Sequence, residues 1–224
     1  MTATNPLTRL WQIMVAHRWQ LVVWFVVVLV PLALFAMLAE DVWTEERFAF
    51  DDPILLYAHS HATPILDLGM LWVTRLGYAW GVVPVDIVVG IWLLVRHRWR
   101  DSAFFIVAVG GAALLNLSAK ALFGRERPKL WPSIAPEHTF SFPSGHAMGS
   151  TALAVALIVL LWPTRWRYLS LIVGIVVILL VGASRIYLGV HYPSDILAGW
   201  LASLAWVVGT SGIVYRSFGR PRPS

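Results

Sequence analysis

The sequence predicts an all-α fold, a bundle of six membrane-spanning helices with both ends of the chain in the cytoplasm. The first observation is composition: the 224 residues are 58% hydrophobic and 13% charged, and soluble domains carry about twice that charged fraction. The second is a series of apolar stretches long enough to cross about 30 Å of hydrocarbon. The third is an unequal distribution of lysine and arginine between alternate loops. Residues 1–224 are therefore predicted to form one membrane domain.

The predicted spanning helices lie near residues 20–39, 79–95, 102–123, 146–162, 167–186 and 194–215. The basic residues before the first helix resemble the start of a signal peptide. Its length and the weak cleavage site after it favour a retained helix. Gly77 separates the second helix from another apolar piece, 66–76. That piece is either an interfacial or re-entrant segment or an extension of the second helix.

Residues 40–78 are predicted to lie on the extracytoplasmic side along the membrane interface, because 40–65 mixes acidic and aromatic side chains. Basic residues favour the cytoplasmic side of a membrane. One set of helix ends holds Arg9, Arg18, Arg96, Arg98, Arg100, Arg165, Arg167, Arg216, Arg220 and Arg222. The other set holds seven basic residues, of which five lie in or beside the motifs described below, leaving only Arg47 and Arg75. The first set is therefore predicted to be cytoplasmic.

Polar residues are concentrated in three short segments, with the sequences KALFGRERP (120–128), PSGH (143–146) and SRIYLGVHYPSD (184–195). The first two share the loop between the third and fourth predicted helices, and the third lies between the fifth and sixth. An even number of membrane crossings separates these loops. All three segments should therefore emerge on the same, extracytoplasmic face, where they can meet in one site.

The cations of these segments suit a phosphate group. Lys120 offers a point charge, and Arg127 and Arg185 offer planar forks that match phosphate oxygens. Ser144 is a predicted N-cap, the helix that follows it favours an anion at its first amides, and Gly145 permits close approach to the backbone. Taken singly, each feature also fits an interfacial cation or an ordinary helix start.

Two histidines could supply the reactive groups. Asp195 follows His191 by four residues, and a carboxylate that accepts the Nδ1 proton leaves Nε2 free to attack phosphorus. His146 adjoins the predicted anion site. The adjacent carboxylate favours His191 as the nucleophile, but the residues alone leave the roles of the two histidines open.

In combination, the spacings K-x6-RP, PSGH and SR-x5-H-x3-D resemble the signatures of the type 2 phosphatidic acid phosphatase (PAP2) family, with every defining position matched. The resemblance implies a metal-independent phosphatase without a cofactor that forms a phosphohistidine. It implies that His191 is the nucleophile, that Asp195 orients it, and that His146 protonates the leaving oxygen and then activates water. The phosphate-binding residues it implies are Lys120, Arg127, Ser144, Gly145 and Arg185.

We therefore expect an integral-membrane enzyme that hydrolyses a lipid phosphate or pyrophosphate at the outer face of a bacterial inner membrane. Undecaprenyl pyrophosphate, phosphatidylglycerol phosphate and phosphatidic acid suit the motifs equally, since the motifs address only the phosphate. One alternative is a phosphotransferase that passes the group to another lipid. The other is a non-catalytic lipid-binding or transport protein, which would be expected to have lost a motif residue.

Other residues restrict the remaining chemistry. The chain has no cysteine, which excludes thiolate metal sites and cysteine nucleophiles. Its basic residues are spread over helix ends, so the expected partners are a lipid substrate and the bilayer rather than nucleic acid. His59, His61 and His138 offer too few ligands for a metal, and none is predicted. Charges at membrane depth are costly, so Arg75 is expected to reach the interface and Asp86 to be hydrogen-bonded.

Overall fold

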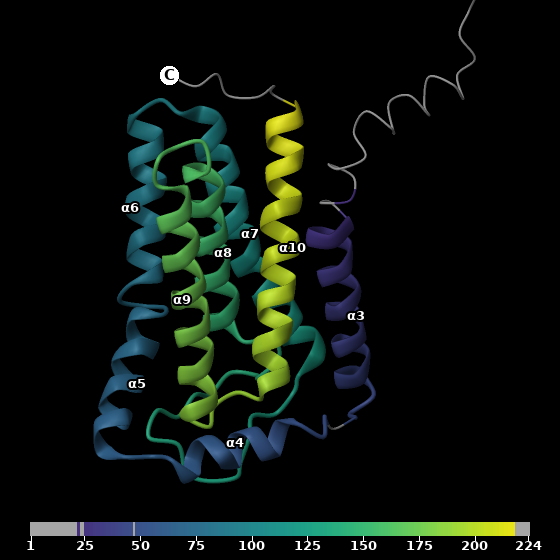
Figure 1. Cartoon of the computed structure of the whole chain (residues 1–224). Coiled ribbons are helices and arrows are strands. Elements are labelled where there is room, and N and C mark those ends of the chain that lie inside the picture. The colour runs from purple at the N-terminus through teal and green to yellow at the C-terminus, as the bar shows by residue number, and fades with distance from the viewer. Residues whose placement is uncertain (1–21, 23–24, 47, 218–224) are drawn as a thin grey trace, which may run out of the picture.

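The computed structural model describes residues 22, 25–46 and 48–217, and all regular elements within these ranges are helices. In chain order they are η1 (Phe25–Leu29, a π-helix), α3 (Val30–Trp43), α4 (Asp51–Ser60), α5 (Pro64–Leu76), α6 (Val82–Val95), α7 (Trp99–Phe123), α8 (Gly145–Leu161), α9 (Arg167–Tyr187) and α10 (Pro193–Ser217). The long helices stand side by side in a bundle, and α4 lies across one of its ends (Figure 1). The all-α prediction is confirmed for the described ranges.

Among the described residues, four helical segments are long and apolar enough to cross a membrane: Phe25–Trp43, Trp99–Phe123, Arg167–Tyr187 and Pro193–Tyr215. The apolar helices α6 and α8 are shorter, with 14 and 17 residues. At 1.5 Å per residue, α6 extends about 21 Å and falls short of the hydrocarbon thickness of about 30 Å. α5 continues below α6 on the same side of the bundle (Figure 1). The two helices together therefore run the height of the bundle, with a break between them.

The break at residues 77–81 separates α5 from α6, so residues 66–76 belong to an upright helix rather than to a segment along the interface. The predicted ranges from 79–95 to 194–215 otherwise agree with α6 to α10 to within three residues at each end. The prediction for 20–39 falls partly on residues 20, 21, 23 and 24, which lie outside the described ranges. Its described part extends to Trp43, four residues beyond the expected end.

Local chemistry sets several of these boundaries. The Thr63 hydroxyl caps α5 by accepting a hydrogen bond from the Leu66 amide at 3.3 Å. Ser144 caps α8 in the same way through the Ala147 amide at 3.4 Å, as its sequence position predicts. α7 ends at Gly124, whose φ of 59° lies in the left-handed region that glycine adopts without strain. This turn directs the chain into the loop that carries Arg125 and Arg127.

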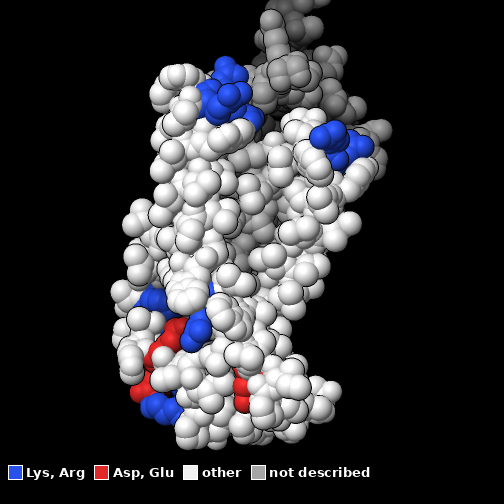
Figure 2. All heavy atoms as spheres, turned by 90° about the vertical axis from the view of Figure 1, so that its left-hand side faces the viewer, with Lys and Arg blue, Asp and Glu red and all other residues white. Residues whose placement is uncertain are grey.

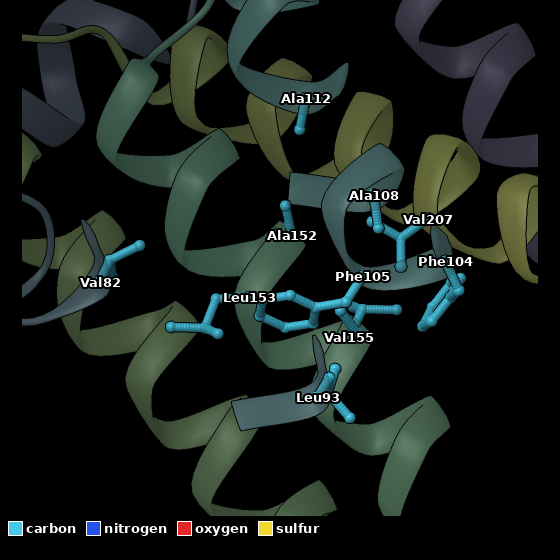
Figure 3. Packing of buried hydrophobic residues seen from close by; sticks show 11 residues of the cluster. Val82, Leu93, Phe104, Phe105, Ala108, Ala112, Ala152, Leu153, Val155 and Val207 are labelled. Carbon is cyan, nitrogen blue, oxygen red and sulfur yellow. The ribbon is translucent and has the colours of Figure 1, made fainter. Parts of the chain in front are cut away.

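The helices pack through small and aromatic side chains in the middle of the bundle. Phe104 and Phe105 of α7 are fully buried against α6, α8 and α10 (Figure 3). Buried alanines of α7 and α8 belong to the same cluster and let the helices approach closely, as at other helix interfaces in membranes: Ala108, Ala112, Ala152 and Ala156. α10 contacts α3, α7 and α8, so the last of the described helices is a central one.

The chain alternates in direction, and the loop of residues 124–144 and the short α9–α10 connection both lie at the α4 end of the bundle (Figure 1). Segments that are far apart in sequence therefore meet there. On the face drawn in Figure 2, basic side chains gather without acids at the opposite end, acids and bases are mixed at the α4 end, and the middle is uncharged. The uncharged middle fits a membrane, and on this face the two ends differ in charge.

The two charges expected at membrane depth behave differently. The Arg75 guanidinium lies 5.7 Å from the ring centre of Trp72 and 5.6 Å from that of Trp80, so it makes cation–π contacts. Asp86 has a buried Oδ1 that has no hydrogen-bond partner within the described ranges. The expectation that Asp86 is a hydrogen-bonded group is therefore wrong for this oxygen.

Candidate active site

His191 and Asp195 form a fully buried pair where the chain enters α10. His191 Nδ1 lies 3.3 Å from Asp195 Oδ2, and the two side chains are 1% and 0% exposed. Pro193 begins α10, so Asp195 lies in the first turn and faces back to His191. Burial, followed by the charges of Arg185 and Arg127, holds the pKa of His191 well below its usual value. The imidazole is therefore neutral at neutral pH.

Arg127 determines which nitrogen of His191 carries the proton. Its Nη1 lies 3.0 Å from His191 Nε2 and donates to the Val190 carbonyl at 2.6 Å. Arginine is only a donor, so Nε2 must carry no proton and accept the Arg127 hydrogen bond through its lone pair. The proton of the neutral ring is then on Nδ1, beside Asp195. This is the arrangement that a nucleophilic Nε2 requires.

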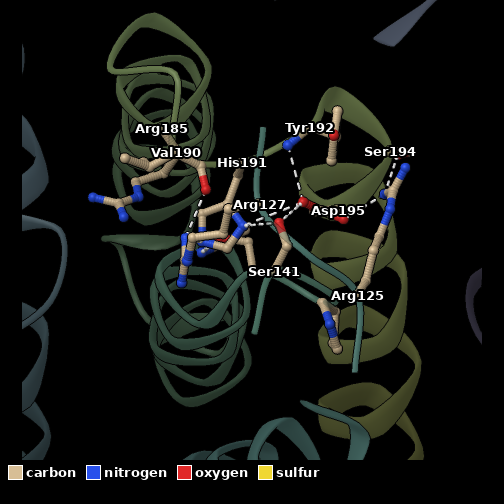
Figure 4. A network of polar contacts seen from close by, with 12 residues as sticks. Arg125, Arg127, Ser141, Arg185, Val190, His191, Tyr192, Ser194 and Asp195 are labelled. Carbon is tan, nitrogen blue, oxygen red and sulfur yellow. Dashed lines mark hydrogen bonds and ion pairs between the residues drawn. The ribbon is translucent and has the colours of Figure 1, made fainter. Parts of the chain in front are cut away.

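Asp195 itself is held from several directions (Figure 4). Its Oδ2 accepts hydrogen bonds from the Tyr192 amide at 2.9 Å and from the Ser141 hydroxyl. Its Oδ1 pairs with Arg125 Nη1 at 2.6 Å. The carboxylate consequently has no freedom to rotate without breaking charged hydrogen bonds.

Two further cations come from the ends of helices. Arg185, in the last turn of α9, is 2% exposed and donates to the Thr74 hydroxyl of α5 and to Glu137. Lys120, in the last turn of α7, donates to the Phe140 carbonyl. Because α5, α7 and α9 each contribute, the position of these cations depends on the packing of the whole bundle.

Glu137 is the carboxylate at the centre of this group of cations. Its Oε2 accepts from Arg127 Nη2 at 2.7 Å, its Oε1 pairs with Arg185, and the same Oε1 is 4.0 Å from His146 Nδ1. Burial would raise the pKa of Glu137, but Arg185 and Arg127 lower it to about 2. Glu137 therefore remains an anion, bound by cations that suit a phosphate group.

The PSGH segment forms the start of α8. His146 is 17% exposed, and its ring lies 4.9 Å from that of Tyr78, in the α5–α6 break. A Cβ on Gly145 would lie 3.0 Å from the Asn116 side chain of α7. Glycine here thus lets α7 and α8 approach each other. The fully buried Ser144 uses its amide to donate to the Asp195 carbonyl at 3.2 Å.

A family profile described as the PAP2 superfamily matches residues 101–220, more than half of the chain and all three motifs. The chain belongs to the PAP2 superfamily. Phosphatidylglycerophosphatase B of Bacillus subtilis (strain 168) is 29% identical over 175 residues, which cover 76% of this chain and 86% of that protein. Undecaprenyl-diphosphatase of Sulfolobus acidocaldarius is 28% identical over 169 residues, covering 73% and 77%.

The fold of this PAP2 protein is also found in a solved structure. A transmembrane PAP2-type phosphatidylglycerolphosphate phosphatase from Bacillus subtilis superposes with a TM-score of 0.74 and 28% identity, over 86% of this chain and 98% of that chain. The apolar helices and this transmembrane relative together support a membrane protein. The recognition of the family from its three motifs is confirmed.

The sequence-predicted residues of this PAP2 chain are brought to one end of the bundle. Arg127 links directly to His191, and Glu137 links Arg127, Arg185 and His146. Sequence reasoning missed several partners of these residues: Asp51, Thr74, Tyr78, Arg125, Glu137 and Ser141. Only Arg125, Glu137 and Ser141 lie in the loop of residues 124–144, which carries motif residues. In that loop, an acidic residue among cations was a signal of a place in the site. Nothing local to the other three indicated a place in the site.

Proposed function

We propose that this PAP2 protein is an integral-membrane phosphatase that hydrolyses the terminal phosphate of a lipid phosphomonoester or pyrophosphate. The observation that carries the proposal is the pair of histidines beside a set of cations that already holds one anion, the Glu137 carboxylate. A phosphate group bound by Arg127 and Arg185 would replace that carboxylate. It would then lie next to His191 Nε2, which Arg127 also contacts.

The proposed reaction has two steps. His191 Nε2 attacks phosphorus, the P–O bond to the lipid breaks, and its electron pair leaves with the lipid oxygen, which takes a proton from the imidazolium form of His146, favoured by the bound phosphate anion. A water molecule then gives a proton to His146 and attacks the phosphohistidine. The P–N bond breaks, and its electron pair returns to Nε2. Dephosphorylated lipid and inorganic phosphate are the products, and no metal or cofactor takes part.

An apolar groove supports a lipid rather than a soluble substrate. A cavity of about 410 Å³ lies along α8 and α9, and its α8 wall includes Ser150, Leu157 and Leu161. Ser150 lies four residues after His146, Leu157 seven after Ser150, and Leu161 four after Leu157. These three residues and His146 therefore share one face of the helix. The groove therefore begins one turn from His146 and runs away from the charged end. A hydrocarbon tail in it would extend into the membrane while the phosphate reached the cations.

The charge difference between the two ends supports the orientation of the site. Basic residues favour the cytoplasmic side, and they gather without acids at the end opposite the site on the face of Figure 2. The proposed active site therefore faces the extracytoplasmic side of a bacterial inner membrane. Labelling with a membrane-impermeant maleimide tests this in intact cells. A single cysteine replacing the exposed His138 should react, and one replacing the exposed Arg165 should not.

The activity is tested with purified protein in detergent that contains a chelator. Phosphate release is measured with phosphatidylglycerol phosphate, undecaprenyl pyrophosphate and phosphatidic acid. We expect release from at least one of them, and none from the variant His191→Ala. If the whole panel yields no phosphate, the proposed hydrolysis is wrong. Transfer of labelled phosphate to another lipid instead of water would identify a phosphotransferase.

A further inference from the structure

Arg125 bridges two buried carboxylates that are far apart in the sequence. Its Nη1 donates to Asp195 Oδ1 at 2.6 Å, and its Nη2 donates to Asp51 Oδ2 at 3.0 Å. The two carboxylates are 0% and 4% exposed, and the arginine side chain is 15% exposed. Charges this deeply buried are costly unless they are paired with good geometry. Each of the three groups therefore depends on the other two.

Asp51 connects this bridge to α4. It is the first residue of that helix, and its Oδ1 accepts from the Ser194 amide at 2.9 Å. Its Oδ2 also accepts from the Ser194 hydroxyl at 2.6 Å. Since Ser194 lies in the first turn of α10, Asp51 provides a cap for α10 from another helix. The Asp51 carboxylate therefore holds both Arg125 and Ser194, the residue directly before Asp195.

The guanidinium of Arg125 is also fixed by aromatic rings. It lies 4.2 Å from the ring centre of Tyr192 and 5.7 Å from that of Phe48. Stacking and forked hydrogen bonds are both properties of arginine that lysine does not reproduce. The side chain thus has a single position, and in that position it reaches Asp195 from the side opposite His191 (Figure 4).

We infer that Arg125 and Asp51 are positioning residues for the nucleophile, acting through Asp195. This inference rests on the proposed function, because it assumes that His191 attacks the phosphate. Arg125 holds Oδ1, which leaves Oδ2 directed at His191 Nδ1. Asp51 holds Arg125 in turn. Without this pair, Asp195 would keep only the contacts of Oδ2 with Tyr192 and Ser141, its Oδ1 charge would be unpaired, and the carboxylate would hold His191 less firmly.

Kinetics of three variants test the inference: Arg125→Met, Arg125→Lys and Asp51→Asn. A misplacement of about 1 Å can cost about 100-fold in rate. We expect kcat to fall about 100-fold in Arg125→Met, less in Arg125→Lys, and least in Asp51→Asn, with KM within about twofold of wild type. The control is Lys129→Met, in the same loop. Lys129 is 75% exposed and pairs with the exposed Glu126, so its loss should leave kcat unchanged.

Chemical rescue tests whether Arg125 positions Asp195 for the reaction or only stabilises the fold. A cavity of about 650 Å³ borders Arg125, Asp51 and Tyr192, so a free guanidinium ion could reach the place that Arg125→Ala leaves empty. We expect added guanidinium to raise the kcat of Arg125→Ala about tenfold or more, and methylammonium to have a smaller effect. Unchanged kcat in folded Arg125→Lys and Asp51→Asn, or a change in KM alone, would overturn the inference. An inactive wild-type protein would instead overturn the proposed function.

Discussion

His191 and His146 have unlike surroundings, although both lie near Arg127 and Arg185. His191 and Asp195 are 1% and 0% exposed and are held by the start of α10. His146 and Glu137 are 17% and 28% exposed, and His146 Nδ1 lies 4.0 Å from Glu137 Oε1. Glu137 belongs to the loop between α7 and α8 rather than to a helix. The first pair is complete before any substrate binds. The second contains an anion that a phosphate group would have to displace, so the two halves of the site should respond differently to substitution and to the choice of substrate.

Removing the buried nucleophile should have the largest effect. His191→Ala leaves no group able to accept the phosphoryl, and we expect phosphate release to fall by about 10⁴-fold or more on every substrate. Phosphate release from purified protein measures this, and a thermal melt confirms folding. Near-native turnover would show that the buried pair is not the reacting one.

Removing His146 should have a large effect that depends on the leaving group. Loss of a general acid costs about 10² to 10⁴-fold when the leaving oxygen needs a proton. A nitrophenyl phosphate ester has a leaving group that needs none, so His146→Ala should still release a first equivalent of nitrophenol. His191→Ala should release none. If both variants, or neither of them, released this first equivalent of nitrophenol, the two histidines would not differ in role.

Filling the apolar groove should have an intermediate effect confined to lipid substrates. Leu157→Trp occupies the groove without touching the polar residues, and we expect kcat/KM for a long-chain lipid phosphate to fall about tenfold, the range for changes in an apolar pocket. Activity on a water-soluble phosphomonoester should not change. Ile172→Trp is the matched control, because Ile172 is 60% exposed and lies outside the groove lining. An equal loss on both substrates would place the tail elsewhere.

Neutralising Glu137 should have the smallest effect on turnover. In Glu137→Gln the competing charge is lost, and we expect inorganic phosphate to inhibit a few-fold more strongly, because charged hydrogen bonds are about twice as strong as neutral ones. The folded-state pKa of about 2 lies below the usual 4.5. The stability contributed by the carboxylate is therefore present above pH 4.5 and is lost as the pH falls toward 2. Melting temperatures should show this acid loss in wild type and not in the variant.

The sequence and the structure agree where information is local. Apolar length predicted most helix limits to within three residues, whereas the roles that the motifs give to the two histidines and the cations stay predictions. The break before α6 was harder to predict because α5 is itself apolar and only the short stretch from Gly77 to Gly81 marks the interruption. Asp51 could not be predicted as a neighbour of Asp195. Its partners Arg125 and Ser194 are 74 and 143 residues away, and a carboxylate at the start of a helix has no periodicity that reveals such distant contacts.

The contact between Asp51 and Ser194 also bears on how the protein is made. A ribosome completes α4 long before α10, since 143 residues separate the two partners. Until α10 is inserted, Arg125 has neither Asp195 nor a fixed Asp51 to hold it, and His191 has no orienting carboxylate. Contacts between distant parts of a chain form late in folding because closing a long loop costs entropy before the contact forms. A chain interrupted during synthesis would therefore be a membrane protein with most of its helices and without an organised nucleophile.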